Sequence, residues 1–375
     1  METVPLVAGL IPSSIPVTPA AFASHFGKSQ YDWGYATVPQ KGSSDRAVYW
    51  ARGKGLGGSS GINFFQYHLP AKSDVDAFEK LGNVGWNWDL FKKYHTKSEK
   101  FEKPAKVEET MSLDLNEHGT QGPYRLESIY HETLHNMGIQ RAAEPFSGDT
   151  KGTWLTPVTI HPAQRVRTYA ANMYLKPVLS RDNLTVLVSS HVSGISTTTV
   201  SDGVKATSVM FVNEGKSYEA FVQREVIVAA GAIGSPQVLE LSGIGSDTVL
   251  KKVGVDVKVN LPGETIADLQ SFVELIKFNR RVVELEPMKG KELNPGSECQ
   301  TDAEIAEWLA KNHNTTYHTV GSCSMLPRED GGVVDTRLKV YGTSNIRVVD
   351  VSVLPVHIGA HLQAADIIKG NIFKA

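Results

Sequence analysis

The most constraining feature of the sequence is a run of small residues that directly follows a short apolar segment. Residues 225–230 read Glu-Val-Ile-Val-Ala-Ala, and residues 231–245 read Gly-Ala-Ile-Gly-Ser-Pro-Gln-Val-Leu-Glu-Leu-Ser-Gly-Ile-Gly. The first segment has the length and the β-branched content of a buried parallel strand. The second predicts a tight turn and a short helix that ends on another glycine turn. Backbone packed this closely is typical of sites that hold a flat cofactor.

A second glycine-rich block lies far upstream, at residues 52–63, and reads Arg-Gly-Lys-Gly-Leu-Gly-Gly-Ser-Ser-Gly-Ile-Asn. Its glycines satisfy the G-x-G-x-x-G pattern of nicotinamide-binding Rossmann units, and Asp74 lies near the distance expected of a ribose partner. A Rossmann unit needs a long helix after the turn, whereas Gly58–Gly61 keeps this segment loop-like and Pro70 stops it. We therefore expect a loop of small residues whose backbone N–H groups face the phosphate or ring of a flavin.

The composition argues against several classes of function. The chain has 375 residues, 41% of them hydrophobic and 21% charged, which is enough for a large core. A formal net charge of -2 without a basic stripe makes nucleic acid and anionic membrane surfaces poor partners. Two cysteines, Cys299 and Cys323, are too few for a disulfide framework or a thiolate zinc cluster.

The apolar segment at residues 4–23 invites comparison with a signal peptide. It contains four prolines, and the only charged residue before it is Glu2. Because prolines break an apolar helix and signal peptides begin with basic residues, we expect no signal peptide here. No apolar run elsewhere approaches the length of a membrane span. We expect a soluble protein, and the sequence does not indicate its compartment.

The remaining sequence predicts a mixture of helices and strands. Residues 74–100 have the pattern of helices, with Asp74 as the N-cap and a break at 82–85. Further helices are expected at 302–309 and 360–373. Runs rich in β-branched residues predict strands at 184–190, 192–200, 204–212, 218–222, 226–230 and 345–355.

Both glycine blocks resemble signatures of the glucose–methanol–choline (GMC) oxidoreductases. Residues 53–63, followed by Tyr67, Pro70 and Asp76, look like the first signature, and residues 231–245 resemble the second at every position. Shorter matches run through most of the chain, at 31–35, 118–123, 167–171, 183–186, 318–325, 333–342, 345–355 and 361–363. The resemblance implies FAD as the cofactor. It also implies an α/β fold (mixed α and β) with a three-layer FAD-binding core and an antiparallel substrate-binding sheet.

The resemblance implies a catalytic chemistry. The family oxidises alcohols, and hydride passes from the alcohol carbon to the flavin N5 as the hydroxyl proton leaves. By similarity, His318 and His361 form the catalytic pair, one accepting the proton and both holding the substrate oxygen. His361 is expected to begin the last helix, whose dipole favours a neutral imidazole. Which histidine is the main base stays open, and His357 is interpreted as a packing residue on the substrate side.

The resemblance also implies a set of cofactor-binding residues, and it implies no metal. They are Gly57, Gly58, Ser59, Ser60, Asn63 and Phe64 along the flavin and pyrophosphate, Val192 at the adenine, Ala230 and Gly231 at the ribose-phosphate, and Asp350, Val351, Leu362 and Gln363 beside the isoalloxazine ring.

Three segments of the family pattern have no counterpart. They are a strand–turn–helix before Gly53 that seats the FAD pyrophosphate, a long segment after Gly263, and part of the helix after His361. We therefore expect a core that lacks the N-terminal dinucleotide-binding βαβ unit. The expected parts are a truncated first FAD-binding part (1–125), a substrate or cap region (126–180), a second FAD-binding part (181–264), an abbreviated substrate-binding region (265–312) and a C-terminal part with the catalytic histidines (313–375).

These features favour FAD-dependent oxidation of a primary alcohol of a small organic molecule to the aldehyde, in specialised metabolism rather than on sugars. Oxygen or another acceptor would take the electrons. Three alternatives stay open: an inactive remnant, a lyase on the same fold, and a zinc protease. The last rests on His131-Glu132-Thr-Leu-His135, an H-E-x-x-H pattern, although Arg141 stands where a metzincin needs its third histidine.

Overall fold

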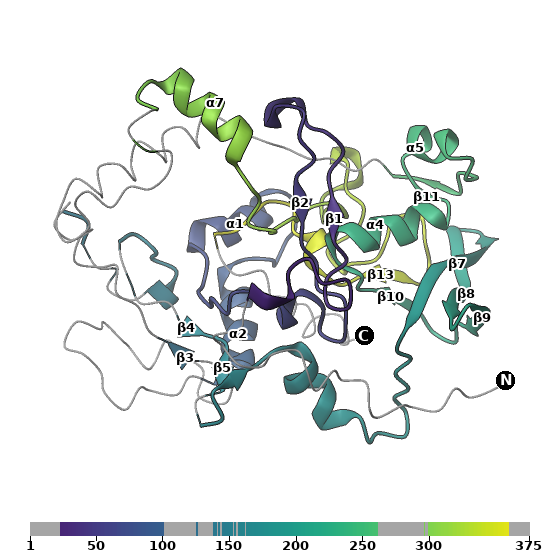
Figure 1. The fold of residues 1–375 in the computed structure, drawn as a ribbon. Coiled ribbons are helices and arrows are strands. Elements are labelled where there is room, and N and C mark those ends of the chain that lie inside the picture. Colours follow the sequence, from purple (N-terminus) through teal and green to yellow (C-terminus); the bar gives the residue numbers. More distant parts are fainter. Residues whose placement is uncertain are drawn as a thin grey trace.

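The computed structural model describes residues 23–100, 125–126, 138–140, 142, 145–152, 154, 157–161, 163–261, 296 and 299–359. In this part of the chain, short helices and strands are interleaved (Figure 1). The apolar N-terminal segment, the H-E-x-x-H pattern and the predicted helix at 360–373 lie outside the described residues.

Two helices follow the first glycine block, as predicted. α1 spans Lys72–Lys80 and α2 spans Trp88–Ser98, and glycines in the left-handed conformation separate them. Asn87 caps α2 by accepting the N–H of Leu90 at 3.2 Å. The prediction that Asp74 caps the first helix was wrong. The helix begins two residues earlier, so Asp74 lies in its first turn. A negative charge there still interacts favourably with the helix dipole.

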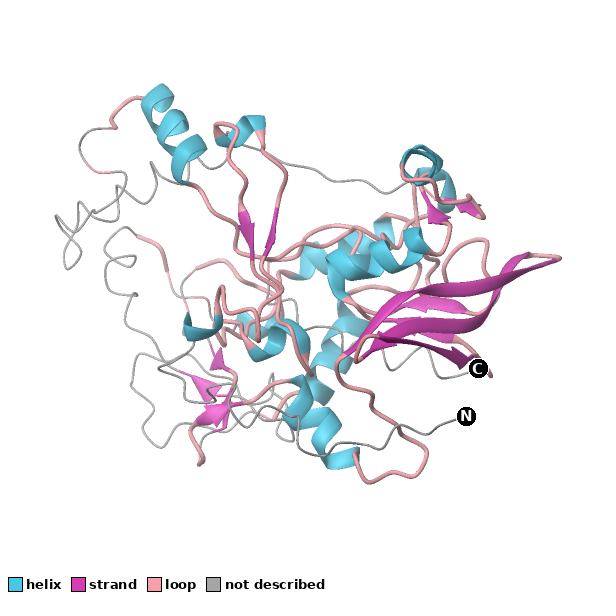
Figure 2. Cartoon of the chain, turned by 45° about the vertical axis from the view of Figure 1, so that its right-hand side comes forward, coloured by secondary structure: helices cyan, strands magenta, loops and turns pink. Residues whose placement is uncertain are grey.

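The predicted antiparallel meander is present as a three-stranded sheet. Its strands are β7 (Ser190–Val200), β8 (Gly203–Asn213) and β9 (Lys216–Phe221), in that order. In the first half of β8, buried residues alternate with exposed ones, as expected of a sheet with one face on the core. Figure 2 shows these long strands beside the helix that the second glycine block forms, α4 (Gly231–Leu241).

The strand predicted at 184–190 is not formed, apart from its last residue. The carbonyl of Val188 accepts a hydrogen bond from the side chain of Asn213 at 2.9 Å, in place of a neighbouring strand. β-branched residues favour a strand only where a partner strand is available. The prediction therefore failed because composition does not report the partner.

A parallel pair of strands carries the second glycine block. β10 (Val226–Val228) pairs with β13 (Ile346–Val348), and α4 (Gly231–Leu241) follows β10 directly. α4 contacts β7 and the 3-10 turn η9 (Val351–Val353). β13 is shorter than the predicted strand at 345–355. The side chain of Asp350 accepts the N–H of Ser352 at 2.8 Å, which starts η9 and ends the extended segment.

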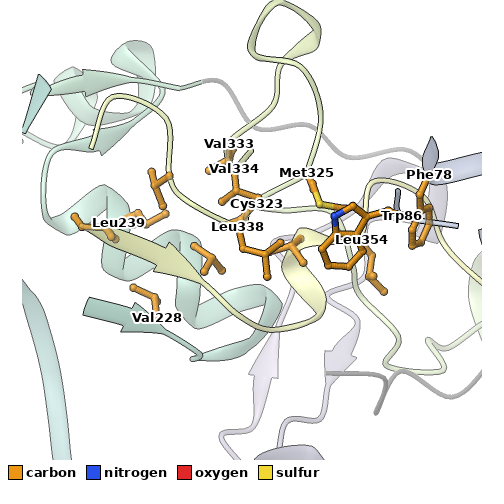
Figure 3. Close-up of a cluster of buried hydrophobic side chains, with 14 of the residues drawn as sticks. Phe78, Trp86, Val228, Leu239, Cys323, Met325, Val333, Val334, Leu338 and Leu354 are labelled. Atoms are coloured by element: carbon orange, nitrogen blue, oxygen red, sulfur yellow. The ribbon is translucent and has the colours of Figure 1, made fainter. Parts of the chain in front are cut away.

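The main core forms around this pair from segments that are far apart in the chain. Figure 3 shows its centre, where side chains of β10 and α4 meet those of the C-terminal segment and of the region around α1. The labelled residues are Phe78, Trp86, Val228, Leu239, Cys323, Met325, Val333, Val334, Leu338 and Leu354. The region around α1 and the second glycine block are therefore joined through residues 323–354.

The other elements are short. The paired strands are β1 (Tyr35–Ala36) with β2 (Tyr49–Trp50), β3 (Arg125–Leu126) with β4 (Pro157–Val158), β5 (Ile160–His161) with β6 (Val166–Arg167), and β11 (Ile244–Gly245) with β12 (Val259–Asn260). The helices are α5 (Asp247–Lys252) and α7 (Asp302–Asn312), and the single turns are η2 (Lys41–Ser43), η3 (Gly58–Gly61), η5 (Pro145–Ser147), η6 (Ala171–Leu175), η7 (Lys176–Val178) and η8 (Arg328–Asp330). A mixed fold of helices and strands is confirmed.

The start of α7 and the length of the described helices concern two further sequence predictions. Thr301 and Glu304 form a reciprocal capping box at the start of α7, which confirms the helix predicted at 302–309. Among the described helices, none has the length and apolar character needed to cross a bilayer.

Candidate functional site

The first glycine block folds into a tight loop around η3. Gly57, in the left-handed conformation at φ 86°, precedes this turn, and its carbonyl accepts the hydroxyl of Ser60 at 2.6 Å. The start of the block packs on the same loop. A Cβ on Gly53 would lie 2.3 Å from the carbonyl oxygen of Gly58, so only glycine fits there. The predicted loop is confirmed, and no long Rossmann helix follows it.

A second segment holds this loop from the side. Arg167 donates from Nη1 to the side-chain oxygen of Asn63 at 2.7 Å, and the N–H of Ala170 donates to the hydroxyl of Ser60 at 3.1 Å. Residues 167–171 match the family pattern in the sequence, but the sequence predicted no role for them. The motif itself was the signal, since its residues turn out to anchor the glycine loop.

His318 lies next to the beginning of the same block. It is part of an irregular segment after α7, and the following residue, Thr319, fixes its position. The hydroxyl of Thr319 accepts hydrogen bonds from Trp50 Nε1 at 2.8 Å and from Arg52 Nη2 at 2.7 Å. Residues far apart in the sequence are thereby held together.

An aromatic contact connects the glycine loop with the His318 segment. The ring of Phe26 stacks on Phe64 with centroids 5.4 Å apart, and it lies 5.5 Å from the ring of Tyr317. Phe64 is 48% exposed in spite of this contact. A large exposed aromatic ring near a candidate base is suited to contact a ligand.

His357 approaches His318 from the C-terminal side. Its Nε2 lies 3.0 Å from the carbonyl oxygen of His318, and the two rings are nearly parallel with centroids 6.3 Å apart. Its Nδ1 lies 3.0 Å from the carbonyl oxygen of Ile358. His357 is exposed, so the interpretation as a packing residue is too simple. Its polar contacts position the backbone of His318.

The surroundings of His318 favour the neutral imidazole. Although the residue as a whole is exposed, neighbours crowd its ring, and this partial desolvation is the main cause that lowers its pKa below the ordinary 6.5. Positive charge on His357, Arg52 and His68 lowers the pKa further. Burial also lowers the pKa of His68 itself. A neutral imidazole at neutral pH can accept a proton.

The second glycine block presents small residues at the junction of β10 and α4. Ala230 is exposed, and a Cβ added to Gly231 would meet nothing within 4 Å. The N–H of Gly231 donates to the carboxylate of Asp350 at 3.0 Å, and the hydroxyl of Ser235 donates to the same group. The Asp350 side chain therefore organises the turn, and Val351 beside it is half-buried.

The two halves of the candidate site are connected. The hydroxyl of Ser322 donates to the carbonyl oxygen of Ala232 at 2.6 Å, which ties the His318 segment to the start of α4.

Val192 lies in β7 opposite Phe211, and the ring of the preceding His191 lies 6.4 Å from the ring of Trp33. The start of β7 thus lies near Trp33.

Part of the predicted site lies in the C-terminal residues after Gly359, outside the described part of the chain. His361, Leu362 and Gln363 lie outside the described residues, as do His131, Glu132 and His135 of the zincin pattern. Within the residues that the structure describes, no group of three or more His, Cys, Asp or Glu side chains is arranged to hold a metal ion.

The sequence matches two family models over nearly its whole length. The N-terminal model, described as GMC oxidoreductase, matches residues 8–261, and the C-terminal model with the same description matches residues 256–368. The chain belongs to the GMC oxidoreductase family. It is therefore an FAD-dependent oxidoreductase, and the predicted family, enzyme class and cofactor are confirmed.

Curated relatives of this GMC oxidoreductase have diverse names. The GMC oxidoreductase family protein Mala s 12 of Malassezia sympodialis is 27% identical over 92% of this chain and 84% of that protein. The mitochondrial choline dehydrogenase of Mus musculus is 26% identical over 94% of this chain and 81% of that protein. Dehydrogenase mpl7 of Monascus purpureus is 37% identical, over 62% of this chain and 39% of its own length.

These alignments also bear on the expected gaps. The match to Mala s 12 runs over 517 residues, which exceeds the 375 residues of this GMC oxidoreductase. Segments of the relative inside the aligned region therefore have no counterpart here. This agrees with an abbreviated interior.

Solved structures confirm the fold. An FAD-dependent oxidoreductase from Chaetomium thermophilum superposes with a TM-score of 0.82 at 20% identity, covering 92% of this chain and 90% of that chain. Pyridoxine 4-oxidase from Mesorbium loti superposes with a TM-score of 0.80 at 23% identity, covering 94% and 89%.

The described residues fit FAD. A Cβ added to Gly58 in the first loop or to Gly231 in the second block would meet nothing within 4 Å, and Ala230 is exposed, so both backbone segments leave open space beside them. The side-chain NH2 of Asn63 has no hydrogen-bond partner in the described part of the chain. Small residues and free donors of this kind are what a flat, phosphate-bearing cofactor needs.

Proposed function

We propose that this GMC oxidoreductase oxidises a primary alcohol of a small organic molecule to the aldehyde, with His318 as the proton acceptor. The observation that carries the proposal is the position of a neutral imidazole beside the first glycine loop, fixed through Thr319 by Trp50 and Arg52. Two similar proteins are named for choline and pyridoxine, both of which contain primary alcohol groups. This similarity supports the substrate class.

Each group of the site has a part in the proposed reaction. Bound FAD supplies the hydride acceptor. His318 takes the hydroxyl proton, and His361 is proposed to share the substrate oxygen. The guanidinium of Arg52 lies beside the His318 segment, and its positive charge stabilises the negative charge that develops on the substrate oxygen.

The proposed cofactor contacts follow from the resemblance and from the exposed backbone. Gly57–Ser60, Asn63 and Phe64 would line the flavin and pyrophosphate, and Val192, Ala230–Gly231, Asp350–Val351 and Leu362–Gln363 would contact the rest of FAD. We propose the division that the sequence predicts: FAD-binding parts at 1–125 and 181–264, a substrate or cap region at 126–180, a substrate-binding region at 265–312, and a C-terminal part at 313–375.

The test is an absorbance spectrum of the purified chain with FAD, recorded before and after anaerobic addition of a primary alcohol. Choline, pyridoxine and benzyl alcohol cover cationic, heteroaromatic and aromatic substrates. We expect the flavin band to bleach with at least one of them and to stay unchanged with the matching aldehyde. If the chain retains flavin but no alcohol bleaches the flavin band, the result favours the lyase alternative. A chain that retains no flavin would favour the inactive remnant.

The surroundings of His318 predict a pH dependence. Since protonated His318 cannot accept a proton, kcat/KM should rise with pH through an apparent pKa below 6.5 and reach a plateau at neutral pH. His357→Asn should move this pKa upward, because the substitution removes the electrostatic effect by which the neighbouring imidazole lowers the pKa of His318. The pH profile of kcat/KM measures the shift. His191→Asn, at an exposed position of β7, is the control. An unchanged pH profile in His357→Asn would contradict the prediction.

A further inference from the structure

The side chain of Asn63 is held in one orientation. Its oxygen accepts a hydrogen bond from Arg167 Nη1 at 2.7 Å and another from the backbone N–H of Phe65 at 3.2 Å. A carboxamide oxygen has two lone pairs, and both are used. The amide cannot be turned around, because its NH2 would then face two donors. The NH2 group therefore points away from Arg167.

The backbone of Asn63 is fixed as well. Its N–H donates to the carbonyl oxygen of Ser59 at 3.0 Å, which places it at the exit of the glycine loop. Asn63 is half-buried, and its Nδ2 has no hydrogen-bond partner among the described residues. A donor with a defined direction is thus presented at the edge of the loop.

Arg167 holds Asn63 at an energetic cost. Its side chain is 0% exposed and lies over the ring of Phe65, 3.8 Å from the centroid. Nε and Nη2 have no hydrogen-bond partner, and no carboxylate in the described part of the chain pairs with the guanidinium. Burial lowers its pKa to about 10. A buried, unneutralised cation is unfavourable for folding, so its retention calls for another role.

We propose that Arg167 is a positioning residue that fixes the Asn63 carboxamide so that its NH2 donates to an acceptor oxygen of bound FAD. The inference rests on the proposed function only in taking FAD as the ligand, and it does not depend on alcohol oxidation. FAD offers two kinds of acceptor, the pyrophosphate oxygens and the carbonyl oxygens of the flavin ring. An amide N–H can donate to either kind of oxygen, whereas a carboxylate at position 63 would repel both kinds.

Asn63→Asp separates this role from a structural one. The substitution keeps an oxygen toward Arg167 and adds the negative charge that the buried cation lacks, but it removes the NH2 donor. We expect the apo chain to melt at an unchanged or higher temperature. The affinity for FAD should fall about 10- to 100-fold, as for the loss of a hydrogen bond to a charged group. Quenching of flavin fluorescence measures binding without turnover, and Asn314→Asp on an exposed loop is the matched control.

Titration with riboflavin identifies the acceptor. A loss of affinity for both FAD and riboflavin assigns the flavin ring, and a loss for FAD alone assigns the pyrophosphate; both results support the proposal. Unchanged FAD affinity in Asn63→Asp overturns it. So does a lower melting temperature of apo Asn63→Asp, because the effect is then structural. A parent chain that binds no FAD overturns it as well.

A second comparison tests whether Arg167 acts through Asn63. Asn63→Ala removes the amide, and Arg167→Gln weakens its anchor. If Arg167 acts through the amide, FAD binding in the double variant should be no weaker than in Asn63→Ala alone. Additive losses would overturn the positioning role. Should Arg167→Gln fail to fold, the Asn63→Asp measurement decides by itself.

Discussion

Replacing His318 with alanine should slow the reduction of bound FAD by a primary alcohol by about 100- to 10,000-fold, the usual contribution of a general base. The substitution removes an imidazole whose pKa is lowered by partial desolvation and by the electrostatic effects of His357, Arg52 and His68. The structural anchors of the segment should persist, since Thr319 keeps its hydrogen bonds to Trp50 and Arg52. Stopped-flow absorbance under anaerobic conditions measures this step apart from reoxidation.

The controls for this prediction are FAD affinity and a distant histidine. His318→Ala should bind FAD about as tightly as the parent chain, and His191→Ala should reduce its flavin at the parent rate. A His318→Ala variant whose flavin is reduced at nearly the parent rate would rule out His318 as the proton acceptor. His361→Ala would then be the variant to examine.

The second large effect is expected from Gly53→Ala. A Cβ at this position would lie 2.3 Å from the carbonyl oxygen of Gly58 and 2.8 Å from the N of Ser59. Both are backbone atoms, so the loop must change its path to admit a methyl group. We expect the free energy of unfolding to fall by about 2–3 kcal/mol. FAD retention should be lost, because the predicted flavin contacts from Gly57 to Ser60 share this loop.

Gly42→Ala is the matched control, because a Cβ on Gly42 would meet nothing within 4 Å. Its free energy of unfolding should change by less than about 0.5 kcal/mol. Denaturant unfolding of the apo chain and FAD titration measure the two effects separately. If Gly53→Ala unfolds at the parent denaturant concentration and retains FAD, the loop has room for a methyl group and the prediction is wrong.

Local signals predicted the elements whose turns and ends are specified by neighbouring residues. The strand–turn–helix at β10 and α4 follows from an apolar run and a left-handed glycine, and α7 follows from the reciprocal bonds of Thr301 and Glu304. Long-range partners explain the failures. The segment 184–190 is not a strand, because a side chain of β8 satisfies part of its backbone.

The sequence by itself determined the family, the cofactor and the identity of His318 as a candidate base, because long motifs specify which residue types stand where. Only the tertiary structure decided the chemical state of that histidine. Arg52, His68 and His357 reach it from distant parts of the chain, and their effect depends on distance and burial. The same holds for the anchoring of Asn63 by Arg167. A motif shows that these residues are present, whereas folding decides which of their atoms meet and which are left to bind a ligand.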